Sequence, residues 1–105
     1  LVVEACADVN VMPTTLNTKS KGDYVTAVIK LPAGYDNTII DISTVKLQGT
    51  LSPVSSSSTV DSATVKFNRA AVAGIVSPGS NTMFVTGSTT DGKLIFVGSS
   101  IMNVL

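Results

Sequence analysis

The chain of 105 residues contains no histidine, no tryptophan and only one cysteine, Cys6. Without histidine, catalytic sites that pair serine or cysteine with an imidazole base are excluded, as are imidazole metal ligands. A single cysteine cannot build a thiolate zinc site or an internal disulfide. The glycines match neither a phosphate-binding loop nor a dinucleotide fingerprint. We therefore expect a protein that is not an enzyme and that uses no cofactor and no metal.

Charge is also scarce, because Asp, Glu, Lys and Arg make up only 13% of the residues and the formal net charge is zero. The absence of a basic patch argues against nucleic acid and anionic membrane surfaces as partners. No run of eighteen apolar residues is present, so we expect no membrane span. Serine and threonine account for 26 residues. This weakly charged, hydroxyl-rich composition is typical of a secreted, extracellular or cell-surface protein.

The dominant pattern is alternation of apolar and polar residues in short segments separated by turn signals. Segment 69–76 changes to a helical period, with Asn68 as a candidate N-cap. Asp91-Gly92 is a tight-turn signal, Gly98 indicates a bulge or bend, and the serine-rich segment 52–58 predicts an exposed loop. The fold class is therefore all-β, an immunoglobulin-like two-sheet β-sandwich of about seven strands with one short helical turn near 69–76 and an N-terminal strand extension. The expected strands cover 1–11, 23–31, 38–42, 44–51, 59–68, 82–87 and 93–105.

The N-terminal segment carries the longest alternating row. Extended over eleven residues, it spans roughly 36 Å, whereas a typical strand covers only about 17–20 Å. Part of the row should therefore lie outside its own sandwich and need a partner. We expect residues 1–8 to form an extension that is a candidate inter-subunit strand, and residues 9–105 to form the sandwich domain. The apolar face of the segment consists of Leu1, Val3, Ala5, Ala7, Val9 and Val11.

The leading functional hypothesis is a non-catalytic subunit of a surface filament or pilus-like assembly. Copies would join head to tail into a homopolymer by exchange of the N-terminal strand. Leu1, Val3, Ala5, Ala7 and Val9 are the candidate interface residues for this exchange. The single Cys6 is a candidate for an intermolecular cross-link.

Two other readings of the same sequence stay open. In the first, the N-terminal segment is an ordinary first strand that crosses between the two sheets of one molecule, with a bend near Ala5-Cys6. The protein would then be a monomeric spacer or adhesion module of a larger surface protein. In the second, the chain is a carbohydrate-binding module with a surface glycan as partner, which exposed and coplanar rings of Tyr24 and Tyr35 would favour.

The stretches LNTKSKGDYVTAVIKLPAGYD, IIDISTVKLQG, VKFNRAAV and VTGSTTDGKLIFVGSS, in this order, resemble an immunoglobulin-like module that recurs in large secreted and surface proteins of bacteria and archaea. The resemblance covers roughly residues 9–105. It implies a sandwich that serves as a spacer, structural or adhesion unit, with no catalytic residues. Many relatives carry an Asp-rich insert before the VKF strand, where this chain has SSSSTVDS, so the resemblance does not imply calcium binding. The LVVEACAD segment lies outside it.

Overall fold

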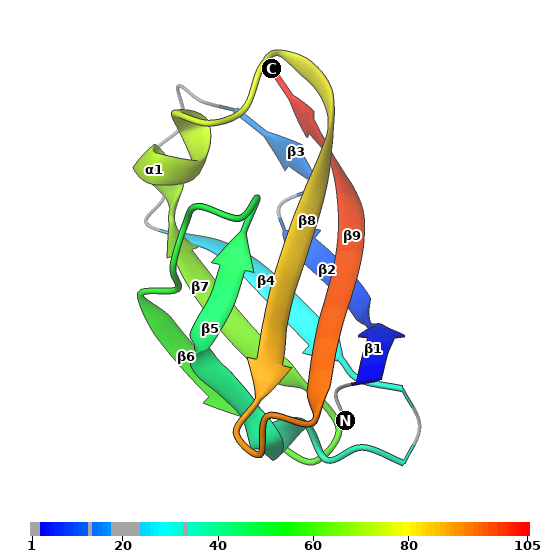
Figure 1. The fold of residues 1–105 in the computed structure, drawn as a ribbon. Coiled ribbons are helices and arrows are strands. Elements are labelled where there is room, and N and C mark those ends of the chain that lie inside the picture. The colour runs from blue at the N-terminus through cyan, green and yellow to red at the C-terminus, as the bar shows by residue number, and fades with distance from the viewer. Residues whose placement is uncertain (1–2, 13, 18–23, 33) are drawn as a thin grey trace.

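The structure is a computed structural model that describes residues 3–12, 14–17, 24–32 and 34–105. It shows two β-sheets packed face to face (Figure 1). In the larger sheet the strand order is β1-β9-β8-β5, and β3 also pairs with β9; in the smaller sheet the order is β2-β4-β7-β6. The predicted all-β, two-sheet sandwich is confirmed.

The described residues form nine strands and two short helical segments. The strands are β1 (Val3–Cys6), β2 (Asp8–Met12), β3 (Thr15–Leu16), β4 (Tyr24–Lys30), β5 (Ile40–Leu47), β6 (Ser55–Ser58), β7 (Ala63–Asn68), β8 (Gly79–Thr89) and β9 (Leu94–Val104). The helical segments are the 3₁₀ helix η1 (Asn37–Ile39) and the α-helix α1 (Arg69–Ala73).

The N-terminal segment is divided between the two sheets. β1 pairs in parallel with β9, and β2 pairs antiparallel with β4 in the opposite sheet. Ala7 lies between the two strands and donates its backbone N–H to the Val97 carbonyl. The prediction of one uninterrupted strand over residues 1–11 is therefore wrong, and the alternative of a segment that crosses between the two sheets with a bend near Ala5-Cys6 is confirmed. The predicted alternation is nevertheless kept, because odd-numbered residues face the core on both sides of the crossing.

Gly98 explains where this crossing occurs. The register between β8 and β9 runs without a shift past Val85 and Gly98, so the expected bulge at this glycine is wrong. A Cβ at residue 98 would instead overlap Val9 and lie 2.7 Å from the Ala7 carbonyl oxygen. The glycine therefore permits a close approach of two strands, which is the other common role of glycine in a sheet.

Two further strand predictions need correction. The predicted strands 38–42 and 44–51 are replaced by one shorter strand, β5 (Ile40–Leu47), with a register shift against β8 between Asp41 and Lys46. Residues 38–39 lie in η1, and residues 48–51 follow the end of β5. The segment 52–58 is not entirely a loop, because β6 (Ser55–Ser58) pairs antiparallel with β7. All four serines of β6 are exposed. Because both faces of this edge strand are in contact with water, its sequence shows no alternation of apolar and polar residues. The strand could therefore not be predicted from that pattern.

The local turn and capping signals are confirmed. The Asn68 side chain accepts a hydrogen bond from Ala71 N at 3.1 Å and so caps α1, which is shorter than the segment 69–76 predicted. Gly92 has a φ of 71° in the turn between β8 and β9, a conformation that glycine adopts without strain. The Asp91 carboxylate accepts from Lys93 N at 2.9 Å and closes the same turn.

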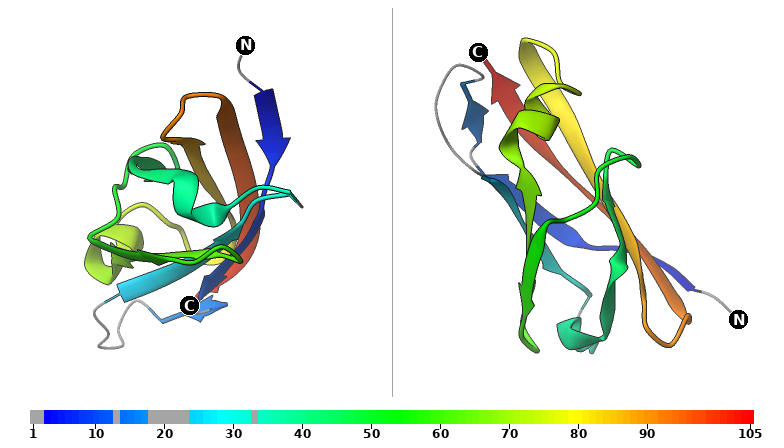
Figure 2. Two further views of the ribbon diagram at one scale, coloured as in Figure 1. Left: turned by 90° about the horizontal axis from the view of Figure 1, so that it is seen from below. Right: turned by 90° about the vertical axis from the view of Figure 1, so that its left-hand side faces the viewer.

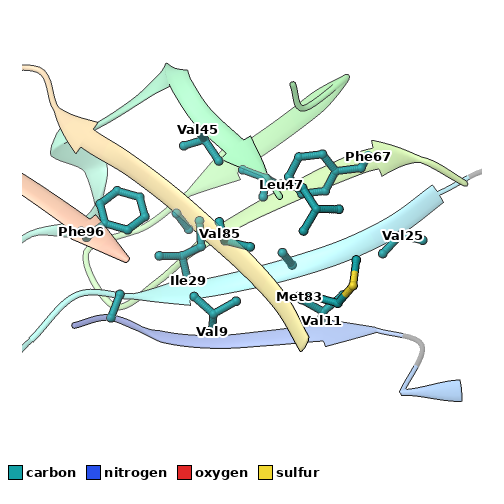
Figure 3. Packing of buried hydrophobic residues seen from close by; sticks show 14 of the residues in the cluster. Val9, Val11, Val25, Ile29, Val45, Leu47, Phe67, Met83, Val85 and Phe96 are labelled. Carbon is teal, nitrogen blue, oxygen red and sulfur yellow. The ribbon is translucent and has the colours of Figure 1, made fainter. Parts of the chain in front are cut away.

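The core lies between the sheets and is filled by inward-facing side chains of both (Figure 3). The largest fully buried side chains include those of Phe67, Phe96, Leu47 and Met83. The molecule is elongated, with principal extents of 43 × 22 × 21 Å. The start of β1 and the end of β9 lie at opposite ends of the sandwich (Figures 1 and 2).

Candidate functional site

The predicted exchange row begins on β1, at the edge of the larger sheet. Val3 lies opposite Leu94 and is 47% exposed, while Ala5 lies opposite Phe96 and packs partly against the core. β1 is therefore a short strand held along one side by β9. Leu1, the first residue of the predicted row, lies outside the described residues.

The second half of the row is buried in the chain's own sandwich. Ala7 and Val9 belong to the core cluster, and Val9 lies opposite Ile29 of β4 (Figure 3). The five predicted interface residues therefore divide into two groups. Val3 and Ala5 are on the peripheral strand, whereas Ala7 and Val9 contribute to the hydrophobic stability of the domain itself.

Cys6 is a free and exposed cysteine at the end of β1. It lies opposite Val97, on the outer face of the larger sheet. Cys6, Phe84, Val97 and Ser99 line part of a shallow hollow of about 250 Å³ on this face. The thiol is thus accessible to a second molecule, as an intermolecular cross-link requires.

The two tyrosines of the glycan hypothesis are not brought together. Tyr24 and Tyr35 are both exposed, but Tyr24 begins β4 and Tyr35 follows the end of this strand. The Lys66 ammonium lies 5.5 Å from the centroid of the Tyr24 ring, within the range of a cation–π interaction. The rings therefore do not form the shared platform on which the glycan hypothesis depended.

Tyr35 instead lines an open hollow of about 480 Å³ with Pro32, Asp36 and Asp61. The Thr38 hydroxyl and then the Thr38 backbone N–H donate to Asp36 Oδ1, and these bonds lower the pKa of this carboxyl below its ordinary value.

Sequence reasoning missed Asn37, the residue that organises this hollow. Its buried side chain accepts from Leu31 N and donates to the Val60 carbonyl, both at 2.8 Å. One amide thus ties the end of β4 to the turn between β6 and β7. A lone asparagine next to an aspartate gives a turn signal in sequence and no sign of these distant partners.

The described residues contain no group of three potential metal-ligating side chains of the His, Cys, Asp and Glu types. Among the same residues, no helix is long and apolar enough to cross a membrane. Comparisons with protein-family models, with curated proteins and with solved structures find no match. The resemblance to an immunoglobulin-like surface module therefore stays a prediction.

Proposed function

We propose that this chain is a non-catalytic structural module that acts as an extracellular spacer, with neighbouring modules joined end to end. The observation that carries the proposal is the course of the N-terminal segment. It pairs with β9 and then with β4 of the same molecule, so the described sandwich is completed by its own strands. The strand β1 starts near one end of the elongated sandwich and β9 ends near the other, so modules joined in series would be arranged along the long dimension of 43 Å (Figure 2).

The composition supports an extracellular location for such a module. The weakly charged composition rich in serine and threonine is typical of surface proteins, and very short edge strands are one device that limits unwanted edge pairing. The serine strand β6, at the edge of the smaller sheet beside β7, has only four residues.

Strand exchange between copies is a second candidate, and the peripheral position of β1 favours it. Only four residues pair with β9, and Val3, Glu4 and Cys6 are all exposed. If β1 paired with β9 of the next copy, the edge of β9 that it left would be free. The β1 strand of another copy could then pair there in the same register, as in domain swapping. Ala7 and Val9 would stay in their own core, so the exchanged row would be Val3 and Ala5 and not the full predicted set.

A disulfide trap distinguishes the two candidates. In the Val97→Cys variant, the new thiol lies opposite native Cys6. Mild oxidation of the full chain should then give a monomer that has lost both free thiols if β1 pairs within its own molecule. A ladder of disulfide-linked oligomers on a non-reducing gel would reject the spacer proposal in favour of exchange. The Val97→Ser variant, which has only Cys6, controls for cross-links that do not depend on this pairing.

A further inference from the structure

The open hollow beside Tyr35 has the composition of a ligand site. Its volume of about 480 Å³ lies within the range of small-molecule sites, roughly 300–1,000 Å³. Pro32 and Val60 give it apolar walls, and Tyr35 contributes an aromatic ring that is 40% exposed. In the described part of the chain, two lining residues carry charge, and both are carboxylates, Asp36 and Asp61. The hollow therefore combines apolar contact area with negative charge.

Hydrogen bonds fix the two segments that form this hollow. The buried Asn37 side chain joins Leu31 N to the Val60 carbonyl, and the Asn37 backbone N–H donates to the same carbonyl at 3.2 Å. The Tyr35 N–H donates to the Pro32 carbonyl at 3.2 Å, which holds the turn that carries the ring. A ligand does not have to order these segments when it binds, and such preorganisation favours binding.

The two carboxylates present acceptors that the protein itself does not use. Both bonds that Thr38 donates to Asp36 end on Oδ1, so Asp36 Oδ2 accepts no hydrogen bond in the described part of the chain. These bonds also lower the pKa of Asp36, which stays ionised to a lower pH than an ordinary aspartate. Within the described residues, the Asp61 side chain makes no hydrogen bond, and neither carboxylate has a cationic partner.

We propose that the hollow binds a protonated primary amine on an aliphatic stem, the chemistry of a lysine side chain on a partner polypeptide. The stem packs against Pro32 and Val60, and the ammonium group lies over the exposed face of the Tyr35 ring. Its N–H groups donate to Asp36 Oδ2 and to the carboxylate of Asp61. An ammonium group has three donors and no acceptor, which complements a site whose charged groups are carboxylate acceptors.

Electrostatics favour this ligand over a neutral one. A sugar could also stack on the Tyr35 ring, but it would leave the charges of Asp36 and Asp61 uncompensated. A cation is attracted both by these carboxylates and by the ring face. The chain already contains one contact of this kind, because the Lys66 ammonium lies 5.5 Å from the centroid of the Tyr24 ring.

The test follows the backbone amide signals of the isotope-labelled full chain by NMR during titration with Nα-acetyl-lysine methylamide. The signals of Tyr35, Thr38 and Asp61 should shift progressively, with a Kd on the order of 1–10 mM for one exposed cation. The same compound acetylated on the side-chain nitrogen keeps the stem but has no charge, and it should bind at least about tenfold more weakly. An increase in salt from about 20 mM to about 300 mM should weaken binding of the charged compound.

Two pairs of variants test the residues of the site. Tyr35→Leu and Asp61→Asn should each raise the Kd about two- to fivefold. The matched controls are Tyr24→Leu, which removes a tyrosine that is 47% exposed on another part of the surface, and Glu4→Gln, which removes one negative charge from β1. Both controls should bind like the unmodified chain. Thermal unfolding of the four variants checks that each is folded.

Three results would reject a lysine side chain as the occupant. One is the absence of shifts at these amide signals up to about 100 mM of the charged compound. Another is equal binding of the charged and the acetylated compounds. The third is the same set of shifts at a concentration at least about tenfold lower with methyl β-D-glucopyranoside or with calcium chloride, which would assign the hollow to a sugar or to a divalent cation. None of these results affects the end-to-end spacer proposal, because that proposal depends on the pairing of β1 and not on this hollow.

Discussion

Gly98 of β9 lies directly against Val9 of β2, so closely that a Cβ at residue 98 would overlap Val9 Cγ2. The same Cβ would come within 2.7 Å of the Ala7 carbonyl oxygen. This contact marks the point where the N-terminal strand leaves one sheet for the other. The small size of one residue in β9 therefore permits the crossing that completes the sandwich.

Substitution of Gly98 by alanine should destabilise the fold. The added methyl group meets the backbone of Ala7 as well as a side chain, so it cannot be accommodated by a change of rotamer alone. Overpacking of this kind costs about 1–3 kcal/mol in the free energy of unfolding, which denaturant titration measures. Ser99→Ala, at the next and exposed position of β9, should change stability by much less. Equal stabilities for the two variants would contradict the close approach.

The sequence predicted the elements with strong local signals and missed those that depend on distant partners. The Asn68 cap and the turn at Asp91-Gly92 are encoded by adjacent residues, so both were predicted correctly. The crossing between the sheets was one of two open readings of the N-terminal segment, with a bend expected near Ala5-Cys6. The apolar pattern alone could not decide for it, because alternate residues face the core in both sheets. β6 was missed because Ser55–Ser58 has no apolar face, and its pairing depends on β7.

The candidate exchange site was also predicted only in part from the sequence. The alternation of the N-terminal segment correctly showed which residues share a face, but it could not show that Ala7 and Val9 are buried in their own core. That distinction depends on which strand pairs with β2. The shared outer face of Phe84 and Ile101 was equally hidden, because these residues are separated in sequence and lie on neighbouring strands only through the register of β8 and β9.

The buried Asn37 side chain should be important for stability. Asn37→Ala removes the acceptor for the buried Leu31 N–H and the donor to the Val60 carbonyl. Leaving a buried backbone donor without a partner costs about 1–3 kcal/mol. Denaturant titration should show this loss, and hydrogen exchange should show earlier opening at Leu31. Asn103→Ala removes an exposed amide from β9 and is the matched control; a similar cost for both variants would indicate that the Asn37 bonds contribute little.

Gln48 continues the pairing of β5 with β8 through its side chain. Its backbone N–H donates to the Phe84 carbonyl at 2.8 Å, its Oε1 accepts from Phe84 N at 2.8 Å, and its Nε2 donates to the Thr82 carbonyl at 2.9 Å. Because these bonds are partly solvated, Gln48→Ala should cost about 1 kcal/mol in the free energy of unfolding. Gln48→Glu keeps the acceptor for Phe84 N but loses the amide donor, so thermal unfolding should place it between the alanine variant and the unmodified chain. A glutamate variant no more stable than the alanine variant would show that the acceptor is not important.

Asp91 should make the stability of the turn between β8 and β9 depend on pH. The Thr89 hydroxyl and then the Lys93 N–H donate to its carboxylate, which lowers the pKa of Asp91 in the folded protein below the ordinary value of 3.8. Because the folded state binds this proton less readily than the unfolded state, the stabilisation is present above 3.8 and is lost as the pH falls through the lower folded pKa.

Melting temperatures measured from about pH 6 down to about pH 2 test this expectation. The Asp91→Asn variant should lose part of the acid-induced decrease in melting temperature. Asp36, whose pKa is also lowered, should account for a further part, so the variant with both Asp36→Asn and Asp91→Asn should show the smallest decrease. Asp61→Asn, which changes a carboxyl group in the turn between β6 and β7, provides a control for the general loss of negative charge. An Asp91→Asn variant with the same pH profile as the Asp61→Asn variant would show that the bonds to Thr89 and Lys93 do not stabilise the ionised carboxylate.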